Sequence, residues 1–201
     1  HTYHTMYEDY LHYVANGKLL KPYHVKQMTR AFCYHIDGVV APSERVQKTI
    51  EGYGVPVPIR VIPTGVNLEQ YQKTNNRKQW RQNLGYDDQC PVLLSLSRLA
   101  YEKNIQEVIG SFPAILKEVP NAQLLIVGDG PARASLENQV HELNLDDNVQ
   151  FAGEINNDHV YCFYQLADLF VSASDTESQG LTYIEALASH LQVVAKTGPY
   201  T

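Results

Sequence analysis

The sequence predicts an α/β protein whose main domain is a doubly wound parallel sheet. From residue 91 onward, short apolar runs alternate with segments long enough to form helices, which is typical of repeated strand–helix–strand units. The apolar runs are nearly continuous, as expected for strands that are buried on both faces. Right-handed crossovers then make the strands parallel, so the loops that follow them gather at one edge of the sheet.

Five strands and four helices are expected in this main domain. The first helical segment has apolar residues at helical spacing, such as Ile105, Ile109 and Phe112. The expected strands are 91–97, 122–128, 148–153, 167–173 and 192–196. The expected helices are 104–119, 132–144, a segment that starts near Asn157, and 181–189.

The first third of the chain is expected to belong to a second α/β domain. A Tyr- and His-rich helical stretch precedes a strand in 37–43, a helix in 44–54 and a strand in 59–66. We therefore divide the chain into the end of one domain (1–66), a polar connector (67–88) and the main domain (89–201). Because the chain starts without Met and stops just after an apolar run, we expect a fragment of a longer protein.

The composition disfavours several functions. No apolar run approaches the ~20 residues that a membrane span needs. The net charge is −6, and the residues after position 50 are the acidic part, which argues against nucleic-acid binding. Cys33, Cys90 and Cys162 are scattered without metal-ligand spacing, which favours idle buried thiols in a reducing compartment.

A basic and apolar stretch at 18–32 has two interpretations. It contains no acidic residue. Its members are Lys18, Lys21, Lys26 and Arg30, which alternate with Leu19, Leu20, Tyr23, Met28 and Phe32. The pattern suits a segment that lies on an anionic lipid surface. The alternative is the solvated face of a helix, because short basic runs are commonly that.

Two cations and two glycines follow the first strands of the main domain. Arg98 and Lys103 stand between a strand and a helix start, where they could bind a diphosphate; the alternative is a surface pair bonded to Glu102. Gly128 and Gly130 allow close approach of a ligand, or simply a tight turn. A dinucleotide fingerprint would need a third glycine where Arg133 stands, so an NAD enzyme is disfavoured.

The segment TESQGLTYIEALAS (176–189) places Glu177 and Glu185 on either side of Gly180 and Leu181. The backbone N–H groups at the start of the following helix suit an anion. A carboxylate next to a phosphate is repulsive, so the two glutamates are expected to accept hydrogen bonds from sugar and ribose hydroxyls. The alternatives are a solvated surface pair and an acid/base pair. The candidate caps of this helix are Ser174, Asp175 and Thr176.

These motifs resemble a known family. SRLAYEKN, VGDGP, FAGEI, ADLFVSAS and ESQGLTYIEALAS occur in the order and spacing of the C-terminal domain of family-4 retaining glycosyltransferases, which have the two-domain GT-B fold. The E-x7-E pattern of Glu177 and Glu185 is a fairly specific mark of that family, and VIPTGVN (61–67) resembles its interdomain segment. HTYHTMYEDYLHYVANGK (1–18) further resembles the bacterial 1,2-diacylglycerol 3-glucosyltransferases.

The resemblance implies a role for each matching residue. Arg98 and Lys103 would hold the donor diphosphate, and Glu185 the ribose hydroxyls. His4 and Glu177 are implied as the catalytic residues that face the transferred sugar. The other implied donor-binding positions are Ile155, whose backbone would meet the base, and Gly180, Leu181 and Thr182. A divalent metal such as Mg is possible but not indicated. A metal site at His1 and His4 is not expected, because no third ligand is apparent.

The resemblance also implies an activity. The parent protein would move glucose from UDP-glucose to the 3-hydroxyl of diacylglycerol, without a tightly bound cofactor, nucleic acid or obligate protein partner. It would be cytoplasmic and peripheral on the inner face of the cell membrane. The alternatives are another nucleotide sugar with a polysaccharide or protein acceptor, and a piece that binds UDP-sugar without turnover.

Two departures from the family pattern carry structural expectations. Ser97 stands where a Gly often precedes the Arg, which is a mild change. His190-Leu191-Gln192 replaces the usual Gly-x-Pro turn, so we expect that turn to be strained or differently shaped.

Overall fold

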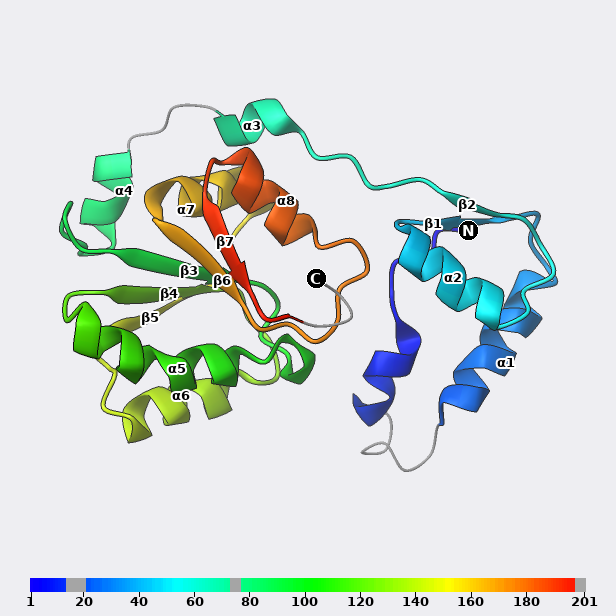
Figure 1. The fold of residues 1–201 in the computed structure, drawn as a ribbon, viewed down its shortest axis with the longest axis horizontal. Coiled ribbons are helices and arrows are strands. Elements are labelled where there is room, and N and C mark those ends of the chain that lie inside the picture. Colours follow the sequence, from blue (N-terminus) through cyan, green and yellow to red (C-terminus); the bar gives the residue numbers. More distant parts are fainter. Residues whose placement is uncertain (14–20, 73–76, 198–201) are drawn as a thin grey trace. The chain divides into compact units, whose positions relative to one another are not determined.

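The computed structural model describes residues 1–13, 21–72 and 77–197, and it divides into two compact units (Figure 1). The smaller unit comprises His1–Gly65 and Thr176–Gly180. The larger unit comprises Val66–Asp175 and Leu181–Pro199. The division into domains and a connector that we drew from the sequence stays a prediction.

The larger unit is built on a five-stranded parallel sheet. Its strands are β3 (Val92–Leu96), β4 (Gln123–Val127), β5 (Val149–Gly153), β6 (Leu169–Ser172) and β7 (Gln192–Ala195). Their order across the sheet is β5-β4-β3-β6-β7, and every neighbouring pair is parallel. This arrangement confirms the predicted doubly wound fold. The strand order reverses between β3 and β6, which makes their carboxyl ends the switch point where ligands bind in such sheets.

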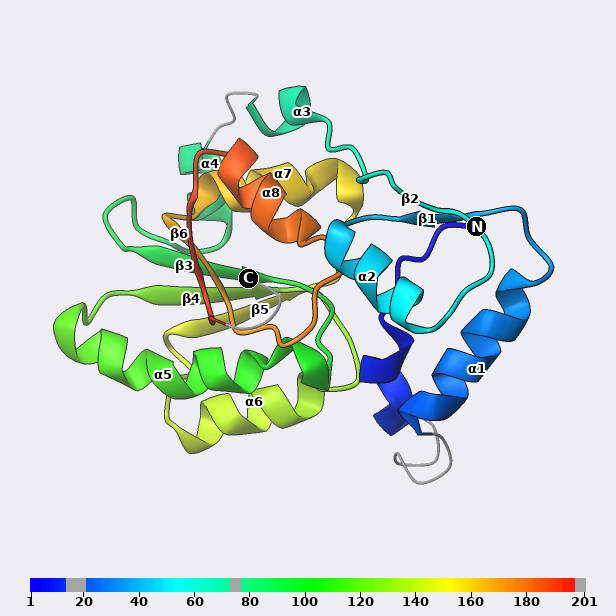
Figure 2. The ribbon, with the colours of Figure 1, turned by 45° about the vertical axis from the view of Figure 1, so that its right-hand side comes forward.

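Helices cover both faces of this sheet. They are α5 (Ile105–Glu118), α6 (Arg133–Glu142), α7 (Val160–Leu166) and α8 (Leu181–Ala188). Figures 1 and 2 show α5 and α6 on one face and α7 and α8 on the other. The segment predicted as a polar connector holds two short helices, α3 (Leu68–Gln72) and α4 (Arg77–Asn83), which pack against α7 and α8. Short 3-10 turns precede α5 and α7 at Tyr101–Lys103 and Asn157–His159.

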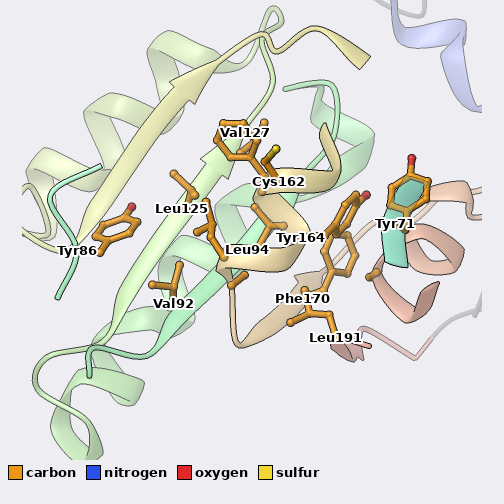
Figure 3. Close-up of a cluster of buried hydrophobic side chains, with 14 of the residues drawn as sticks. Tyr71, Tyr86, Val92, Leu94, Leu125, Val127, Cys162, Tyr164, Phe170 and Leu191 are labelled. Atoms are coloured by element: carbon orange, nitrogen blue, oxygen red, sulfur yellow. The ribbon is translucent and has the colours of Figure 1, made fainter. Parts of the chain in front are cut away.

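Alternation along the strands produces one hydrophobic cluster on each face. Leu94 and Leu125 point to the face of α7, where they pack with Tyr164 and Phe170 (Figure 3). Their strand neighbours point the other way and pack with α5 and α6, because successive strand side chains alternate between faces. The sheet is therefore buried on both sides, which explains the continuous apolar runs.

An ion-pair network ties α4 to the amino-terminal end of the sheet. Arg81 has a side chain that is only 3% exposed and donates to the carboxylate of Asp168, 2.8 Å away. It also donates to the carbonyl oxygens of Asp88 and Cys90, at 2.9 and 2.7 Å. Asp168 accepts from the backbone of Val92 at 2.8 Å and from Arg77. The network lies at the opposite end of β3 from the loop that carries Arg98. We therefore infer that it stabilises the fold and takes no part in ligand binding.

The smaller unit has two parallel strands. Its elements are a 3-10 helix (Tyr7–Tyr13), α1 (Pro22–Cys33), β1 (Val39–Ala41), α2 (Glu44–Gly52) and β2 (Ile59–Val61). Thr2 forms a further parallel bridge with Val40. The segment 176–180 attaches to this unit: Ser43 donates to the Ser178 carbonyl at 2.7 Å, and Gln179 exchanges hydrogen bonds with the Thr64 backbone at 2.8 and 2.9 Å.

The basic stretch of the smaller unit is described in part. Lys18, Leu19 and Leu20 lie outside the described residues. In α1, Val25 is buried, whereas Tyr23, Met28 and Phe32 are exposed on a helix that also carries Lys26 and Arg30. Among the described residues, no helix is both long enough and apolar enough to cross the bilayer.

The turn after α8 has the strain that the sequence predicts. The N–H groups of His190 and Leu191 bond to the carbonyls of Leu187 and Ala186, which is the Schellman arrangement, and His190 occupies its left-handed position with φ 59°. Glycine usually fills this position because a side chain there is unfavourable. The helices α4 and α6 end in the same arrangement, and there Gly85 and Asn144 occupy the left-handed position.

We therefore expect His190→Gly to stabilise the protein by about 0.5–1 kcal/mol, because the relief of backbone strain exceeds the entropy that glycine adds to the unfolded chain. Urea unfolding followed by circular dichroism measures this change. His190→Ala is the matched control, since alanine keeps the strain. Equal stabilisation by both variants would show that the left-handed backbone is not the cause.

Candidate functional site

A pocket of about 940 Å³ lies in the larger unit, where the loops that follow the strands meet. The loop after β3 contributes Ser97 and Arg98, and α8 contributes Leu181, Thr182 and Glu185. The remaining lining comes from β3, β4, α3, the loops after β4 and β5 and the start of α7, and includes Gln70, Tyr71, Gly128, Asp129, Gly130, Glu154, Ile155, Asn157 and Asp158. The pocket thus occupies the carboxyl edge of the sheet, as the fold predicts.

The two glycines of the pocket are required by the protein's own backbone. A Cβ atom on Gly128, which has φ 130°, would lie 1.9 Å from the carbonyl oxygen of Ser97. A Cβ atom on Gly130 would lie 2.4 Å from the carbonyl oxygen of Leu99. Of the two interpretations left open by the sequence, close packing of the strand-to-helix turn accounts for both glycines.

Asp129 lies between these glycines and is held in place by α6. It accepts hydrogen bonds from the backbone of Gly130 at 2.6 Å and from Arg133 at 2.9 Å. These two donors, the Gly130 N–H first, hold the pKa of Asp129 below its usual range. Arg133, the residue that breaks the dinucleotide fingerprint, also bonds to Glu137 at 2.8 Å. The pocket therefore keeps a carboxylate on the loop after β4.

Glu185 is another carboxylate of the pocket and is bonded to a buried tyrosine. The hydroxyl of Tyr164 donates to its Oε2 atom at 2.8 Å. Tyr71, on α3, lies beside the same carboxylate: burial first, and the charge of Glu185 second, raise the pKa of its hydroxyl. The rings of Tyr71 and Tyr164 are 6.0 Å apart, edge to face (Figure 3).

The pocket brings together five of the nine residues that the sequence analysis nominated. They are Arg98, Ile155, Leu181, Thr182 and Glu185. Arg98 is exposed there, as a cation that receives a ligand must be. Lys103 does not belong to the pocket lining, and its ammonium group donates to the hydroxyl of Ser174 at 3.3 Å.

The other three nominated residues belong to the smaller unit. His4 is exposed and follows the buried Tyr3. Glu177 and Gly180 lie in the 176–180 segment, where the carbonyl of Glu177 accepts from Arg45 at 3.4 Å. Gly180 has φ 73° and leads directly into Leu181.

The predicted caps of α8 are wrong, because this helix begins only at Leu181. The three residues bond elsewhere instead. Ser174 accepts from Lys103, Asp175 accepts from Asn104 and Lys196, and Thr176 donates to Asp9.

Several lining residues were not nominated from the sequence. Glu154 directly follows β5 and Asp129 lies two residues past the end of β4, so position alone was a signal for them. Gln70 and Tyr71 come from the predicted connector, where no residue pattern pointed to a pocket.

The remaining reactive side chains are candidate metal ligands and thiols. Within residues 1–13, 21–72 and 77–197, no three His, Cys, Asp or Glu side chains are grouped so that they could hold a metal ion. Cys33, Cys90 and Cys162 are free and buried, which confirms the prediction that these thiols are buried.

A doubly wound sheet with a pocket at its switch point defines a class of ligand-binding α/β domain, and comparison with known proteins gives the family. The model described as "Glycosyl transferases group 1" matches residues 76–200, and the model described as "Glycosyltransferase Family 4" matches residues 1–70. The chain belongs to the glycosyl transferases group 1, and the family resemblance seen in its motifs is confirmed.

Two curated relatives carry the same name. The chain is 46% identical, over its whole length, to the alpha-monoglucosyldiacylglycerol synthase of Streptococcus pneumoniae, of which it covers 46%. It is 30% identical, over 98% of its length, to the protein of that name from Acholeplasma laidlawii, of which it covers 52%. The chain therefore spans about half the length of these relatives.

Solved structures share the fold. Sucrose-phosphate synthase from Thermosynechococcus elongatus has a TM-score of 0.79 at 27% identity, covering 97% of this chain and 49% of that one. Anabaena Alr3699/HepE in complex with UDP-glucose has a TM-score of 0.76 at 24% identity, covering 88% of this chain and 50% of that one. These neighbours confirm the GT-B type of fold.

Proposed function

We propose that the full-length protein is a retaining glycosyltransferase that moves glucose from UDP-glucose to the 3-hydroxyl of 1,2-diacylglycerol. The observation that carries this proposal is the similarity of the whole chain to glucosyldiacylglycerol synthases. The pocket supports the donor part, because an exposed arginine and a helix start at the carboxyl edge of the sheet suit a diphosphate. In this proposal residues 1–66 are the end of the acceptor-side domain, 67–88 the connector and 89–201 the donor domain.

The residues divide the work between binding and transfer. Arg98, Lys103 and the helix start at Gly180-Leu181-Thr182 stabilise the negative charge that develops on the leaving diphosphate. Glu185 accepts hydrogen bonds from the ribose, and the backbone near Ile155 meets the base. His4 and Glu177 face the transferred sugar. The leaving diphosphate helps to deprotonate the incoming hydroxyl on the same face of the sugar, so no protein nucleophile is required.

A second candidate keeps the fold and changes the substrates. GDP-mannose-dependent alpha-(1-6)-phosphatidylinositol monomannoside mannosyltransferase of Mycobacterium tuberculosis is 28% identical over 71% of the chain. Another nucleotide sugar is therefore a candidate donor for the same site, and a polysaccharide or a protein is the alternative acceptor. Because the chain spans half of its relatives, the 201 residues by themselves are also a candidate for binding UDP-sugar without turnover.

Product analysis of the full-length protein tests the proposal. The enzyme is incubated with diacylglycerol vesicles and either radiolabelled UDP-glucose or GDP-mannose, and the lipid product is characterised by NMR. We expect an α-linked glucosyl lipid from UDP-glucose alone. A water-soluble glycosylated product, or a mannosylated lipid, would favour the second candidate. The β-anomer would contradict retention.

The basic helix α1 supports a peripheral position on the cytoplasmic membrane face. Lys26 and Arg30 lie one turn apart on α1, and the exposed Tyr23 lies on the same side of this helix. We expect Lys26→Gln/Arg30→Gln to weaken binding to anionic vesicles at low salt by about 2 kcal/mol, since each basic residue near the surface contributes ~1 kcal/mol. Vesicle sedimentation measures this loss.

The matched control removes two exposed cations of the same unit outside α1, in Lys48→Gln/Arg60→Gln. Its vesicle binding should stay close to that of the original protein. Equal losses in the two double variants would mean that only net charge matters, and no binding by the original protein would contradict the peripheral position.

A further inference from the structure

The carboxylate of Glu185 is held by groups to which the family pattern gives no role. Tyr164 is completely buried on α7, and its hydroxyl donates to Oε2 of Glu185 at 2.8 Å. The Tyr164 ring lies between the rings of Tyr71 and Phe170, at centroid distances of 6.0 and 5.8 Å (Figure 3). Because this ring is enclosed by other aromatic side chains, the position of its hydroxyl is set by the core.

A second tyrosine approaches the same carboxylate from α3. Tyr71 is 8% exposed and lines the pocket together with Glu185. Burial and the neighbouring Glu185 charge both raise the pKa of Tyr71, so its hydroxyl stays protonated at neutral pH and can act as a donor. Its backbone carbonyl accepts from Gln165 on α7 at 2.8 Å, which fixes this part of α3 to the helix that carries Tyr164.

These contacts determine what Glu185 can still bind. An ionised carboxylate has two oxygens with about four acceptor sites. The Tyr164 hydroxyl, which is fixed in the core, occupies one of these acceptor sites and sets the plane of the Glu185 carboxylate. The remaining acceptor sites face the pocket, which both Glu185 and Tyr71 line. A carboxylate held in one orientation suits two adjacent hydroxyls, because a preorganised acceptor loses little entropy on binding.

We propose that Tyr164, assisted by Tyr71, is a positioning residue that orients Glu185 to accept hydrogen bonds from the two neighbouring hydroxyls of a ribose. The inference rests on the proposed function, in which Glu185 binds the ribose of the donor. In addition, the preference for a ribose with both hydroxyls over a ribose that lacks them depends on two tyrosine hydroxyls, one from α7 and one from α3.

The test compares the binding of UDP and 2′,3′-dideoxy-UDP to the full-length protein by calorimetry. Tyr164→Phe keeps the ring in the core and removes only the hydroxyl. We expect it to weaken UDP binding about tenfold, in line with the worth of a hydrogen bond to a charged group, and to leave dideoxy-UDP binding unchanged. Tyr71→Phe should act in the same direction. In a Glu185→Ala background, Tyr164→Phe should cause no further loss.

Tyr183→Phe is the matched control, because it removes a hydroxyl from α8 that lies 3.0 Å from Ser172. Its ratio of UDP to dideoxy-UDP affinity should equal that of the original protein. Failure of the original protein to bind UDP would overturn the proposed function and this inference together. Normal UDP binding with an unchanged ratio in both Tyr164→Phe and Tyr71→Phe would overturn the inference alone, as would equal falls in the ratio in Tyr164→Phe and Tyr183→Phe.

Discussion

Under the proposed function, replacing Arg98 with alanine is expected to lower the rate of glucosyl transfer by the full-length protein about 100-fold, the usual cost of removing one donor from a site where negative charge develops. Arg98 is exposed at the pocket, on the loop that follows the central strand β3. Its planar fork can donate two hydrogen bonds to the leaving diphosphate as negative charge grows on it. Steady-state kinetics with UDP-glucose and diacylglycerol measure the loss, which should fall mainly on kcat.

Two further variants test whether the loss of activity is specific to the guanidinium group of Arg98. Arg98→Lys keeps the charge without the fork, so we expect part of the activity to return. Lys117→Ala removes an exposed cation from the last turn of α5 and should leave transfer unchanged. An Arg98→Ala enzyme with full activity would remove Arg98 from the mechanism.

Arg81→Met is expected to destabilise the fold by about 3 kcal/mol, because the buried guanidinium donates to three acceptors and each lost hydrogen bond costs ~1 kcal/mol. The guanidinium of Arg81 serves the carbonyls of Asp88 and Cys90 and the carboxylate of Asp168. Methionine fills similar volume and leaves both carbonyls without this donor, so the cost comes from lost hydrogen bonds and not from a cavity. Chemical denaturation of the variant measures the change.

Arg77→Met tests whether the burial of Arg81, and not only its charge, accounts for its contribution to stability. Arg77 also pairs with Asp168, but 44% of its side chain is exposed, and such pairs contribute about 0–1 kcal/mol. We expect this variant to lose at most that amount. If Arg77→Met and Arg81→Met lower the free energy of unfolding by the same amount, the burial of Arg81 would not explain its contribution to the stability of the protein.

The fold of the larger unit was predictable because its strands are short, apolar and separated by amphipathic segments. Residues such as Leu94 and Leu125 are buried on a sheet covered on both faces, so their apolar run carries the signal directly. The strain at His190 was also expected, since His190-Leu191-Gln192 replaces the Gly-x-Pro turn of the family, and the structure gives His190 a left-handed backbone.

The rest depended on contacts between residues far apart in the sequence. Tyr71 reaches the pocket because α3 packs on α7 and α8, and nothing in its own segment indicates that packing. The capping pattern at Ser174 was ambiguous for a related reason: its hydroxyl serves Lys103, on another loop, while α8 starts seven residues later. Local propensity cannot distinguish such partners.

The central claim is that the pocket beside Arg98 and Glu185 binds a uridine diphosphate, and calorimetric titration of the protein with UDP tests it most directly. We predict saturable binding at one site, which is strongly weakened in Arg98→Ala and in Glu185→Ala and unchanged in Lys117→Ala. A folded protein that releases no binding heat at any accessible UDP concentration and fails to protect its amides from hydrogen exchange would contradict the claim.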